Sequence, residues 1–487
     1  MNPAIRKVGI GLILLMLVLV GQLTYLQIVD ANNLNNNPHN VRTLLQNANR
    51  PRGDIVTADG TVVARSVAVN DGTEFKYLRV YPTGGLFSQV VGYQSFVFGS
   101  TGVENTYNSD LTGQSLRLQL HSLGDLLSGT QGTGNVVLSL RDDLQRTAQQ
   151  ALGFQRGSVV MLDVPTGNVL AMYSNPAYDP NPLVVHNTAS AQGAFTLING
   201  SPDHPALARA YRELYPPGSS FKTVTATVAL EDGVATPDTE FPVLTQLPLP
   251  QTSATLQNFN GEACGGTLTQ SFTQSCNTTF GRLGLELGNP FVPGMANFGI
   301  GAAPPLDVAP GAVASVGPTA GSFATNMPQF AFAGIGQGVV AVTPLQMALI
   351  AEGIAHGGVV MTPHVVSEIR DTNGKVVQRI DPSPWMPATT PQVAVTVTQM
   401  MTNVVESGTG TAAQIPGVAV AGKTGTAQNA PGQAPHAWFI AFAPAQAPKY
   451  AVAVLVEHGG SLAGDATGGA VAAPIAARML RTALGLP

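Results

Sequence analysis

Three short motifs hold the residues of this chain that are best suited to catalysis. In the first, Ser219 and Lys222 stand three residues apart, where the loop Pro216–Gly218 leads into an apolar, helix-forming stretch. Residues i and i+3 of a helix share a face, and a desolvated lysine amine can take the proton of a serine hydroxyl. A helix N-terminus also offers backbone N–H groups to a developing oxyanion. The spacing therefore predicts a serine nucleophile with a lysine base; the alternative is a solvated surface pair.

The second motif is Ser275-Cys-Asn277. From a turn, a hydroxyl and an amide two residues apart can both point into a cleft. The hydroxyl can then relay a proton, and the amide can hold a substrate amide group. The alternative is an ordinary turn or helix cap, where Ser and Asn are common.

The third motif runs from Lys423 through Thr424, Gly425 and Thr426, directly after an apolar run at 418–421 that predicts a strand. On a strand, Thr424 and Thr426 share one face and Lys423 points to the other. Two hydroxyls and a nearby cation suit a terminal carboxylate. Gly425 permits another backbone to approach closely.

The same stretch also fits a phosphate-binding pattern. Gly417 to Thr424 satisfies G-x-x-x-x-G-K-[ST], which requires a strand, then a glycine loop, then a helix. Here the residues between the two glycines are the strand itself, and the glycines and proline that follow stop any helix. Nucleotide binding is therefore the weaker interpretation of this segment.

Composition excludes several classes of protein. The 487 residues carry a net charge of −5, and only 10% of them are charged. A general nucleic-acid binder would be basic, so nucleic acid is not an expected partner. Two cysteines rule out a disulfide-dense scaffold. Eight histidines are scattered without a His-Glu-x-x-His pattern, so we expect no metal and no cofactor.

One segment is long and apolar enough to cross a membrane. After Arg6 and Lys7, residues Val8–Val29 carry no charge, and as a helix they span about 33 Å. The preceding positive pair places the N-terminus in the cytoplasm and the bulk of the chain outside. A cleaved signal peptide is the alternative, although only Val29-Asp30-Ala31 resembles a cleavage site. The sequence thus predicts a single-pass protein of the cell membrane.

The rest of the chain mixes short strands and helices. A polar, Asn-rich stalk at 32–40 follows the membrane segment. Hairpin-connected strands with helices between them predict a mixed α/β fold with an antiparallel sheet. The expected strands are 134–140, 157–163, 169–173, 418–421, 438–442 and 450–457, and the expected helices are 142–152 and 469–484.

The two cysteines, Cys264 and Cys276, lie 12 residues apart in a part of the chain expected outside the cytoplasm. An oxidising compartment favours a disulfide between them. Because Cys276 lies inside the second motif, the bridge would fix that turn. The alternative is a pair of buried thiols.

The three motifs, in this order, resemble the active-site set of the penicillin-recognising serine acyltransferases. More of the chain is similar to the class B (monofunctional) penicillin-binding proteins, from the membrane segment to about residue 480. The stretches that carry this resemblance are 52–55 with 59–60, 91–93, 102–107, 162–167, 171–172, 178–181, 215–222, 275–280, 334–338 with 343–344, and 436–439.

The resemblance implies how the chain is divided. We expect a cytoplasmic tail at 1–7, a transmembrane anchor at 8–29, a stalk and small non-catalytic α+β domain at 30–155, and a transpeptidase domain at 156–487. The last domain would be an antiparallel sheet flanked by helices, with an all-helical part. No glycosyltransferase domain is expected, because roughly 115 residues are too few for one.

The reaction implied by the resemblance is D,D-transpeptidation of peptidoglycan stem peptides. Ser219 would attack the penultimate D-Ala carbonyl, and Lys222 would take its proton. Ser275, near Lys423, would pass a proton to the leaving D-Ala amine. The backbone N–H groups of Ser219 and Thr426 would form the oxyanion hole.

The resemblance also implies how substrate is held. Asn277 would bind the donor peptide amide, and Thr424 and Thr426 would hold the terminal carboxylate. An amine of a second stem peptide would resolve the acyl-enzyme. A β-lactam, which mimics D-Ala-D-Ala, would leave Ser219 stably acylated. A membrane glycan polymerase is an expected partner, since the chain itself lacks that activity.

Three other functions stay open at this point. A β-lactamase of the same fold needs a base for deacylation, and Glu286 is the candidate between the second and third motifs. A D,D-carboxypeptidase would differ only in using water as the acceptor. A scaffold in a cell-wall complex would act through protein contacts alone, but it would not need the three motifs.

Overall fold

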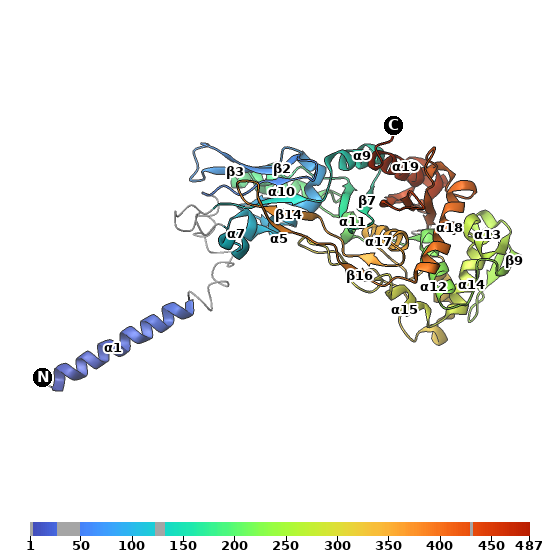
Figure 1. Cartoon of the computed structure of the whole chain (residues 1–487), viewed down its shortest axis with the longest axis horizontal. Coiled ribbons are helices and arrows are strands. Elements are labelled where there is room, and N and C mark those ends of the chain that lie inside the picture. The colour runs from blue at the N-terminus through green and yellow to red at the C-terminus, as the bar shows by residue number, and fades with distance from the viewer. Residues whose placement is uncertain (1–2, 27–48, 122–131, 429–431) are drawn as a thin grey trace. The chain divides into compact units, whose positions relative to one another are not determined.

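The computed structural model describes residues 3–26, 49–121, 132–428 and 432–487 (Figure 1). These residues form two compact units, one of residues 1–51 with 67–78 and one of residues 52–66 with 79–487. The predicted stalk at 32–40 lies outside the described residues.

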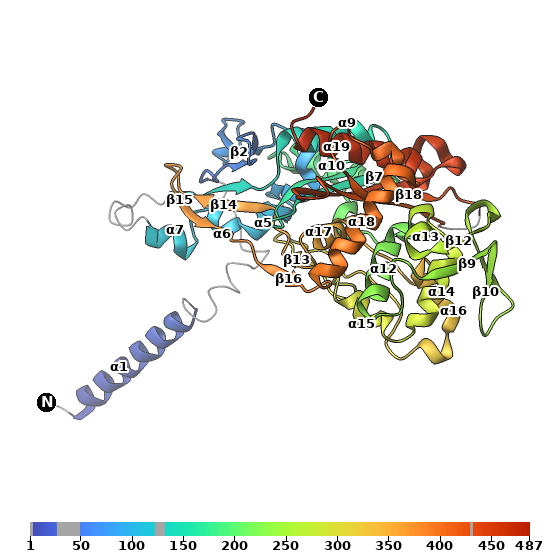
Figure 2. The same cartoon turned by 45° about the vertical axis from the view of Figure 1, so that its right-hand side comes forward.

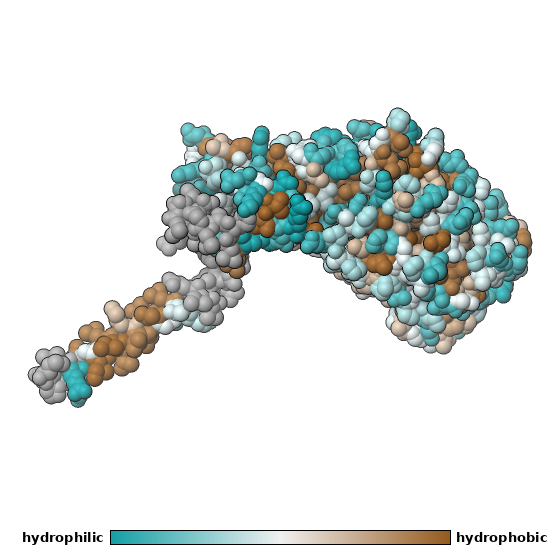
Figure 3. Space-filling view, viewed as in Figure 1, coloured by the Kyte–Doolittle hydropathy of each residue, from teal (hydrophilic) through white to brown (hydrophobic). Residues whose placement is uncertain are grey.

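The first unit contains the N-terminal helix. Helix α1, Pro3–Thr24, is almost wholly apolar after its basic start, and Figure 3 shows its side chains as a continuous hydrophobic surface. Within it, Arg6–Thr24 is long and apolar enough to cross a membrane, and none of it is buried by the protein. The described helix ends before Val29, and residues 27–29 of the predicted span lie outside the described residues.

The second unit is built around a five-stranded antiparallel sheet in the order β17-β18-β19-β7-β8. Its strands are β7 Gly157–Asp163, β8 Val169–Asn175, β17 Ala421–Ala427, β18 His436–Ala443 and β19 Tyr450–Val456. All but β17, which carries Lys423, Thr424 and Thr426, are largely apolar, and the strands are buried on both faces because helices cover both. The helix α17, Pro344–Ala355, lies on one side, and α9, Asp142–Leu152, and α19, Ala473–Ala483, lie on the other (Figures 1 and 2).

A group of helices packs beside strand β17. Figure 2 shows most of this group in green and yellow. Its central helix is α12, Lys222–Glu231, which is buried on nearly all sides and follows a 3₁₀ turn, η4, at Gly218–Phe221. Around it lie α13 Leu268–Gln274, α14 Asn277–Leu287, α15 Phe291–Ala296, α16 Met327–Gly334 and α18 Pro391–Ser407. The predicted antiparallel sheet with a helical part is therefore confirmed.

A second sheet lies nearer the N-terminal end of this unit. The strand order includes β15-β14-β6-β1-β2, with β1 Ile55–Val56, β2 Val62–Ala68, β6 Asn135–Leu138, β14 Val366–Arg370 and β15 Val376–Arg379. Strand β14 pairs antiparallel with β6, with Ile369 opposite Val136. A segment from late in the chain thus completes a sheet begun near its start.

The remaining elements are short. They are β3 Tyr77–Val80, α4 Ser88–Val91, β4 Gln94–Ser95, β5 Gly99–Ser100, α5 Gly102–Thr106, α6 Asn108–Leu111, α7 Leu116–His121, α10 Thr188–Gly200, α11 Arg209–Arg212, β9 Glu240–Leu244, β10 Gln246–Pro248, β11 Thr255–Gln257, β12 Cys264–Thr267, β13 Val360–Met361 and β16 Pro384–Met386.

Two predicted elements differ in kind or start from the structure, while the other predicted strands differ from it by at most two residues at either end. The strand predicted at 418–421 begins only at Ala421, because Val418 closes a tight turn by donating its N–H to the carbonyl of Ile415. The helix predicted at 469–484 starts as a wide turn at Gly468–Ala472 and becomes α-helical only from Ala473.

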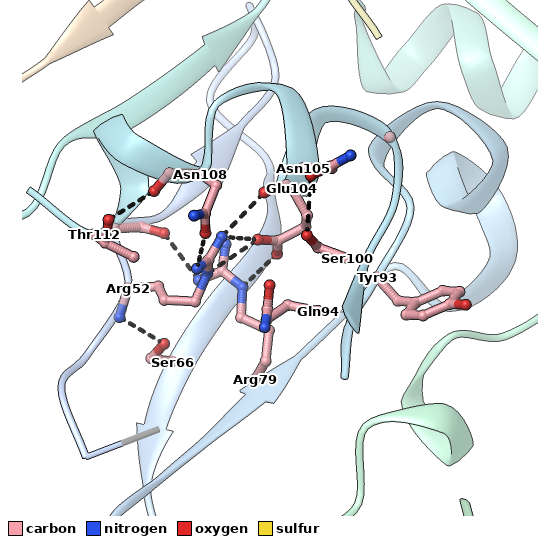
Figure 4. A network of polar contacts seen from close by, with 12 residues as sticks. Arg52, Ser66, Arg79, Tyr93, Gln94, Ser100, Glu104, Asn105, Asn108 and Thr112 are labelled. Carbon is pink, nitrogen blue, oxygen red and sulfur yellow. Dashed lines mark hydrogen bonds and ion pairs between the residues drawn. The ribbon is translucent and has the colours of Figure 1, made fainter. Parts of the chain in front are cut away.

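A buried charge cluster holds the N-terminal part of the second unit together (Figure 4). Glu104, on α5, is fully buried, and its carboxylate accepts hydrogen bonds from Arg52, Arg79 and Tyr81 at 2.5–3.2 Å. Arg52 also donates to Asn108 Oδ1 at 2.7 Å. Burial opposes the ionisation of Glu104, but the two guanidinium groups outweigh it and lower its pKa. One carboxylate thus ties together three segments that are distant in sequence.

Replacing Glu104 with Gln should lower the free energy of unfolding by about 3–5 kcal/mol, because two buried guanidinium groups lose their counter-charge. Chemical denaturation of the two proteins measures this difference. The exposed i,i+4 pair of Glu286 with Arg282 supplies the control: Glu286→Gln should change the free energy by less than about 0.5 kcal/mol. A Glu104→Gln variant as stable as the wild type would contradict the role of the cluster.

Candidate active site

Ser219 lies in the 3₁₀ turn η4, just before helix α12 and three residues before Lys222. The turn is fixed by a hydrogen bond from Gly218 N–H to Gly336 O at 2.9 Å. Gly218 has a φ of 55°, and a Cβ on it would lie 2.6 Å from Thr426 O. A glycine here lets the Ser219 segment press against the backbone of β17.

The side chain of Lys222 runs from the first turn of α12 into a fully buried site. Its Nζ donates to Ser275 O at 2.7 Å and to Asn277 Oδ1 at 2.8 Å, and lies 3.3 Å from Ser275 Oγ. Its amine also lies 5.5 Å from the centre of the Phe280 ring. These contacts join the first motif to the second.

Ser275 lies where α13 ends and α14 is about to begin. Its φ of 64° places it in the left-handed region, which few residues other than glycine adopt. This conformation turns the chain sharply, so that the Ser275 hydroxyl and the Asn277 amide both face Lys222. The Asn277 side chain is held from the other side, where it donates to Gln257 O at 2.9 Å.

Lys423, on strand β17, reaches the same hydroxyl from the opposite side. Its Nζ donates to Ser275 Oγ at 2.9 Å, and the side chain is fully buried. Ser275 Oγ therefore lies between two lysine amines that come from distant parts of the chain.

Both lysines titrate far below their ordinary range. Burial, and then the charge of Lys423, lowers the pKa of Lys222 well below its usual value. Burial alone lowers the pKa of Lys423 to about 7. Among the described residues, no carboxylate forms an ion pair with either amine to offset the burial. A neutral amine is thus available near Ser219 at physiological pH.

The rest of the third motif also lies on β17. The Thr424 hydroxyl is 2.6 Å from that of Thr409, and the Thr426 hydroxyl accepts from Gly468 N–H at 3.3 Å. A Cβ on Gly425 would lie 2.6 Å from Pro217 O and 3.0 Å from Ser220 N. Only glycine lets the strand approach the Ser219 turn this closely.

The structure joins Cys264 to Cys276 in a disulfide with a Cα–Cα distance of 5.4 Å. Cys264 begins strand β12, which pairs with β9, and Cys276 lies between Ser275 and Asn277. The bridge therefore links the turn of the second motif to a small sheet.

All eight motif residues named from the sequence gather in one place. The two lysine amines connect Lys222, Ser275, Asn277 and Lys423 by hydrogen bonds. The β17 backbone at Gly425 lies against the Ser219 turn.

Two other interpretations, nucleotide binding and a deacylating Glu286, fit the structure poorly. Lys423 and Thr424 lie within a strand rather than at the start of a helix, and Glu286 is paired with Arg282 on an exposed helix face.

Two contributors escape sequence reasoning. Thr409, between two glycines, pairs with Thr424 although nothing local marks it. Gly468 donates its N–H to Thr426, but nothing distinguishes it in the sequence from the other glycines among 54.

Among the described residues, no group of three or more His, Cys, Asp or Glu is arranged to hold a metal ion.

Comparison with known proteins gives a direct answer about the family. The family described as "Penicillin binding protein transpeptidase domain" matches residues 157–481, and "Penicillin binding protein A dimerisation domain" matches residues 52–137. This chain belongs to the penicillin-binding protein transpeptidases.

Individual members of the family are similar over nearly the whole chain. The chain is 40% identical to the peptidoglycan D,D-transpeptidase PbpA of Mycolicibacterium smegmatis and 38% identical to PbpA of Mycobacterium tuberculosis, covering 99% of each protein. Among solved structures, the ceftriaxone acyl-enzyme complex of penicillin-binding protein A from M. tuberculosis matches with a TM-score of 0.84 and 36% identity. That match covers 90% of this chain and 100% of the other.

If Cys264 and Cys276 form the bridge in solution, alkylation without reductant should label no cysteine, and alkylation after reduction should label two. Reduction should also lower the free energy of unfolding by about 3 kcal/mol, the value expected for a loop of this length. Intact mass and denaturant unfolding provide the two measurements. Two alkylated cysteines without reductant would refute the bridge.

Proposed function

We propose that Ser219 is the nucleophile with which this penicillin-binding protein cross-links peptidoglycan stem peptides. Membership of the family makes D,D-transpeptidation through a serine acyl-enzyme the activity of the chain. The observation that carries the residue assignment is that Lys222, one helical turn from Ser219, and Lys423 converge on the hydroxyl of Ser275. No other serine of the described chain has two buried amines at its side.

The first half of the reaction forms the acyl-enzyme. A neutral lysine amine has two N–H donors and one lone pair, and Ser275 O and Asn277 Oδ1 accept from the amine of Lys222. The lone pair is thereby left to take the proton of Ser219 as its Oγ attacks the penultimate D-Ala carbonyl carbon. When the C–N bond breaks, the leaving amine receives a proton through Ser275, which lies between both lysines.

Charge develops on the carbonyl oxygen during the attack. The backbone N–H groups of Ser219 and Thr426 are the proposed donors to this oxyanion. The close approach of β17 to the Ser219 turn at Gly425 supports this pairing. Because these donors belong to backbone fixed on both sides, they need little reorganisation during the reaction.

Other groups are proposed to hold the donor peptide. Asn277 binds a substrate amide, and the hydroxyls of Thr424 and Thr426 bind the terminal carboxylate with Lys423 nearby. Thr409 hydrogen-bonds Thr424, which orients that hydroxyl. A β-lactam presents the same carboxylate and reactive carbonyl, so it is proposed to acylate Ser219.

The fate of the acyl-enzyme depends on the acceptor. A lactamase or carboxypeptidase needs a base that activates water, and the sequence offered Glu286 for that role. Its ion pair with Arg282 at 2.7 Å on an exposed face leaves it poorly suited to this task. An amine acceptor from a second stem peptide is the proposed second substrate.

Treating the protein with penicillin should add one molecule covalently to the wild type and none to Ser219→Ala. Intact mass spectrometry measures the adduct, which should persist for hours because, among the described residues, no carboxylate contacts Lys222, Ser275 or Lys423 to activate a water molecule. Rapid turnover of penicillin would instead indicate a lactamase. Folded wild-type protein that forms no adduct would favour the scaffold alternative.

The second-order rate constant for acylation, which combines binding and chemistry, should peak near neutral pH. As the pH falls, Lys222 becomes protonated and loses its lone pair, so acylation slows. Above about pH 7 the Lys423 amine, whose pKa is about 7, loses its charge, which weakens carboxylate binding. Acylation by a fluorescent penicillin, measured from pH 5 to 10, tests this profile. Lys375→Gln, which alters an exposed lysine, is the control and should keep the fall in rate on both the acidic and the basic side. A rate that rises steadily to pH 10 would contradict the lowered lysine pKa values.

Location and partner are also proposals. We place residues 1–7 in the cytoplasm, 8–29 in the membrane, and both 30–155 and 156–487 outside the cell membrane. The basic pair before the apolar α1 supports this orientation.

A membrane glycan polymerase would supply the glycan strands to be cross-linked. Replacing Val8–Val29 with an unrelated transmembrane helix should abolish its co-purification with the full-length protein, whereas retention would refute a role of this helix.

A further inference from the structure

The segment that delivers Ser219 is anchored by one aromatic side chain. Tyr215 is buried, and its hydroxyl donates to Glu457 Oε1 at 2.8 Å. Its ring also makes edge contacts with His436 and Trp438, at 5.5 and 6.3 Å between ring centres. Burial and the charge of Glu457 raise the pKa of Tyr215, so the hydroxyl always remains a donor.

Glu457 is fixed independently of Tyr215. It directly follows β19, is 5% exposed, and its Oε1 also accepts from Arg209 Nε at 2.8 Å. The other nitrogens of Arg209 donate to the carbonyls of Asp203 and His204, so the guanidinium cannot easily turn away. The backbone N–H of Glu457 donates to Arg156 O just before β7. The carboxylate is therefore a rigid acceptor tied to the central sheet.

The backbone between Tyr215 and Ser219 leads directly into the active site. Tyr215 exchanges two hydrogen bonds of 2.9 Å with Val342, and Trp438 Nε1 donates to Pro216 O at 2.9 Å. Two residues later, Gly218 presses on the backbone of Thr426, the residue proposed to supply half of the oxyanion hole. A displacement of Tyr215 would thus reach both Ser219 and the oxyanion donors.

Packing alone does not fix this segment, because one side of it faces a cavity. The cavity has a volume of about 470 Å³, and its walls include Tyr215, Pro216, Arg209, His436 and Glu457. Burial and the neighbouring His458 lower the pKa of His436 to about 4, so this ring is neutral at pH 7 and gives Tyr215 no charged partner. The hydroxyl bond to Glu457 is then the directional contact that holds the Tyr215 side chain.

We propose that Glu457 is a positioning residue for acyl transfer, which acts through the Tyr215 hydroxyl to fix the Ser219 turn against β17. Glu457 takes no part in the chemistry. It holds the nucleophile and the two oxyanion donors at the spacing that the transition state requires, where small displacements are costly. This inference rests on the proposed role of Ser219.

The test separates binding of penicillin from acylation in the full-length protein in detergent. Tyr215→Phe, which removes only the hydroxyl, should lower the acylation rate constant at least about tenfold while the dissociation constant of the non-covalent complex stays within about twofold. Glu457→Asp withdraws the carboxylate from Tyr215 and should lower the rate constant equally. Glu457→Gln keeps an acceptor oxygen in place and should restore it to within about threefold.

The double variant shows whether the two residues act as one. Tyr215→Phe with Glu457→Asp should be no slower than either single variant, because both remove the same bond. Tyr178→Phe and Glu368→Asp, which alter a buried tyrosine and an ion-paired glutamate elsewhere in the unit, are the matched controls and should acylate as the wild type does. Unfolding midpoints measured alongside identify any variant that is merely destabilised.

The outcomes are distinguishable. A Tyr215→Phe variant that acylates at the wild-type rate, effects that multiply in the double variant, or a Glu457→Gln variant as slow as Glu457→Asp would each overturn the positioning role. Wild-type protein that forms no adduct would overturn the proposed role of Ser219, and this inference with it.

Discussion

The structure depends most on a single constraint: two buried lysine amines meet at one serine hydroxyl, and no carboxylate of the described residues pairs with either amine. Burying a charged amine is costly, so the site favours the neutral form that can serve as a base. Lys222, Ser275 and Lys423 come from a helix, a turn and a strand that are separated by 53 and 148 residues. The fold around them must therefore hold three elements to within hydrogen-bond distance of one atom.

Several features of the sequence make that convergence possible. Glycines at 218 and 425 remove the side chains that would separate β17 from the Ser219 turn. The left-handed conformation of Ser275 and the neighbouring disulfide fix the turn of the second motif. The hydrogen bonds that Arg209 and Tyr215 donate to Glu457 hold the segment that leads into Ser219. Each feature restricts backbone position and so organises the site in advance of substrate.

Sequence reasoning succeeded where the signal is local. The helix at 142–152 and the strand at 157–163 have the predicted bounds, because periodicity and turn residues mark both ends of each. The eight motif residues stand out in the sequence because their types and order along the chain are distinctive. That they lie together could be expected only from the resemblance to a known family, since spacing along the chain does not bring distant motifs into contact.

What sequence reasoning missed is non-local. The pairing of β14 with β6 joins residues more than 200 positions apart, and the bond from Tyr215 to Glu457 spans 242. Neither Thr409 nor Glu457 belongs to a recognisable motif, so their roles emerge only once the elements are packed. The late start of β17 reflects a turn hydrogen bond that an apolar run of residues does not reveal.

The central claim is that the paired lysines are not ordinary lysines, and direct titration of their amines tests it most directly. The chain has only six lysines, so ¹⁵N-labelled lysine gives few Nζ signals, and Lys222→Gln and Lys423→Gln variants assign two of them. The account predicts that both amines lose a proton far below the pH at which the exposed lysines do, with Lys423 near pH 7. If both amines remained protonated up to about pH 10, the value of an ordinary lysine, the account would be contradicted.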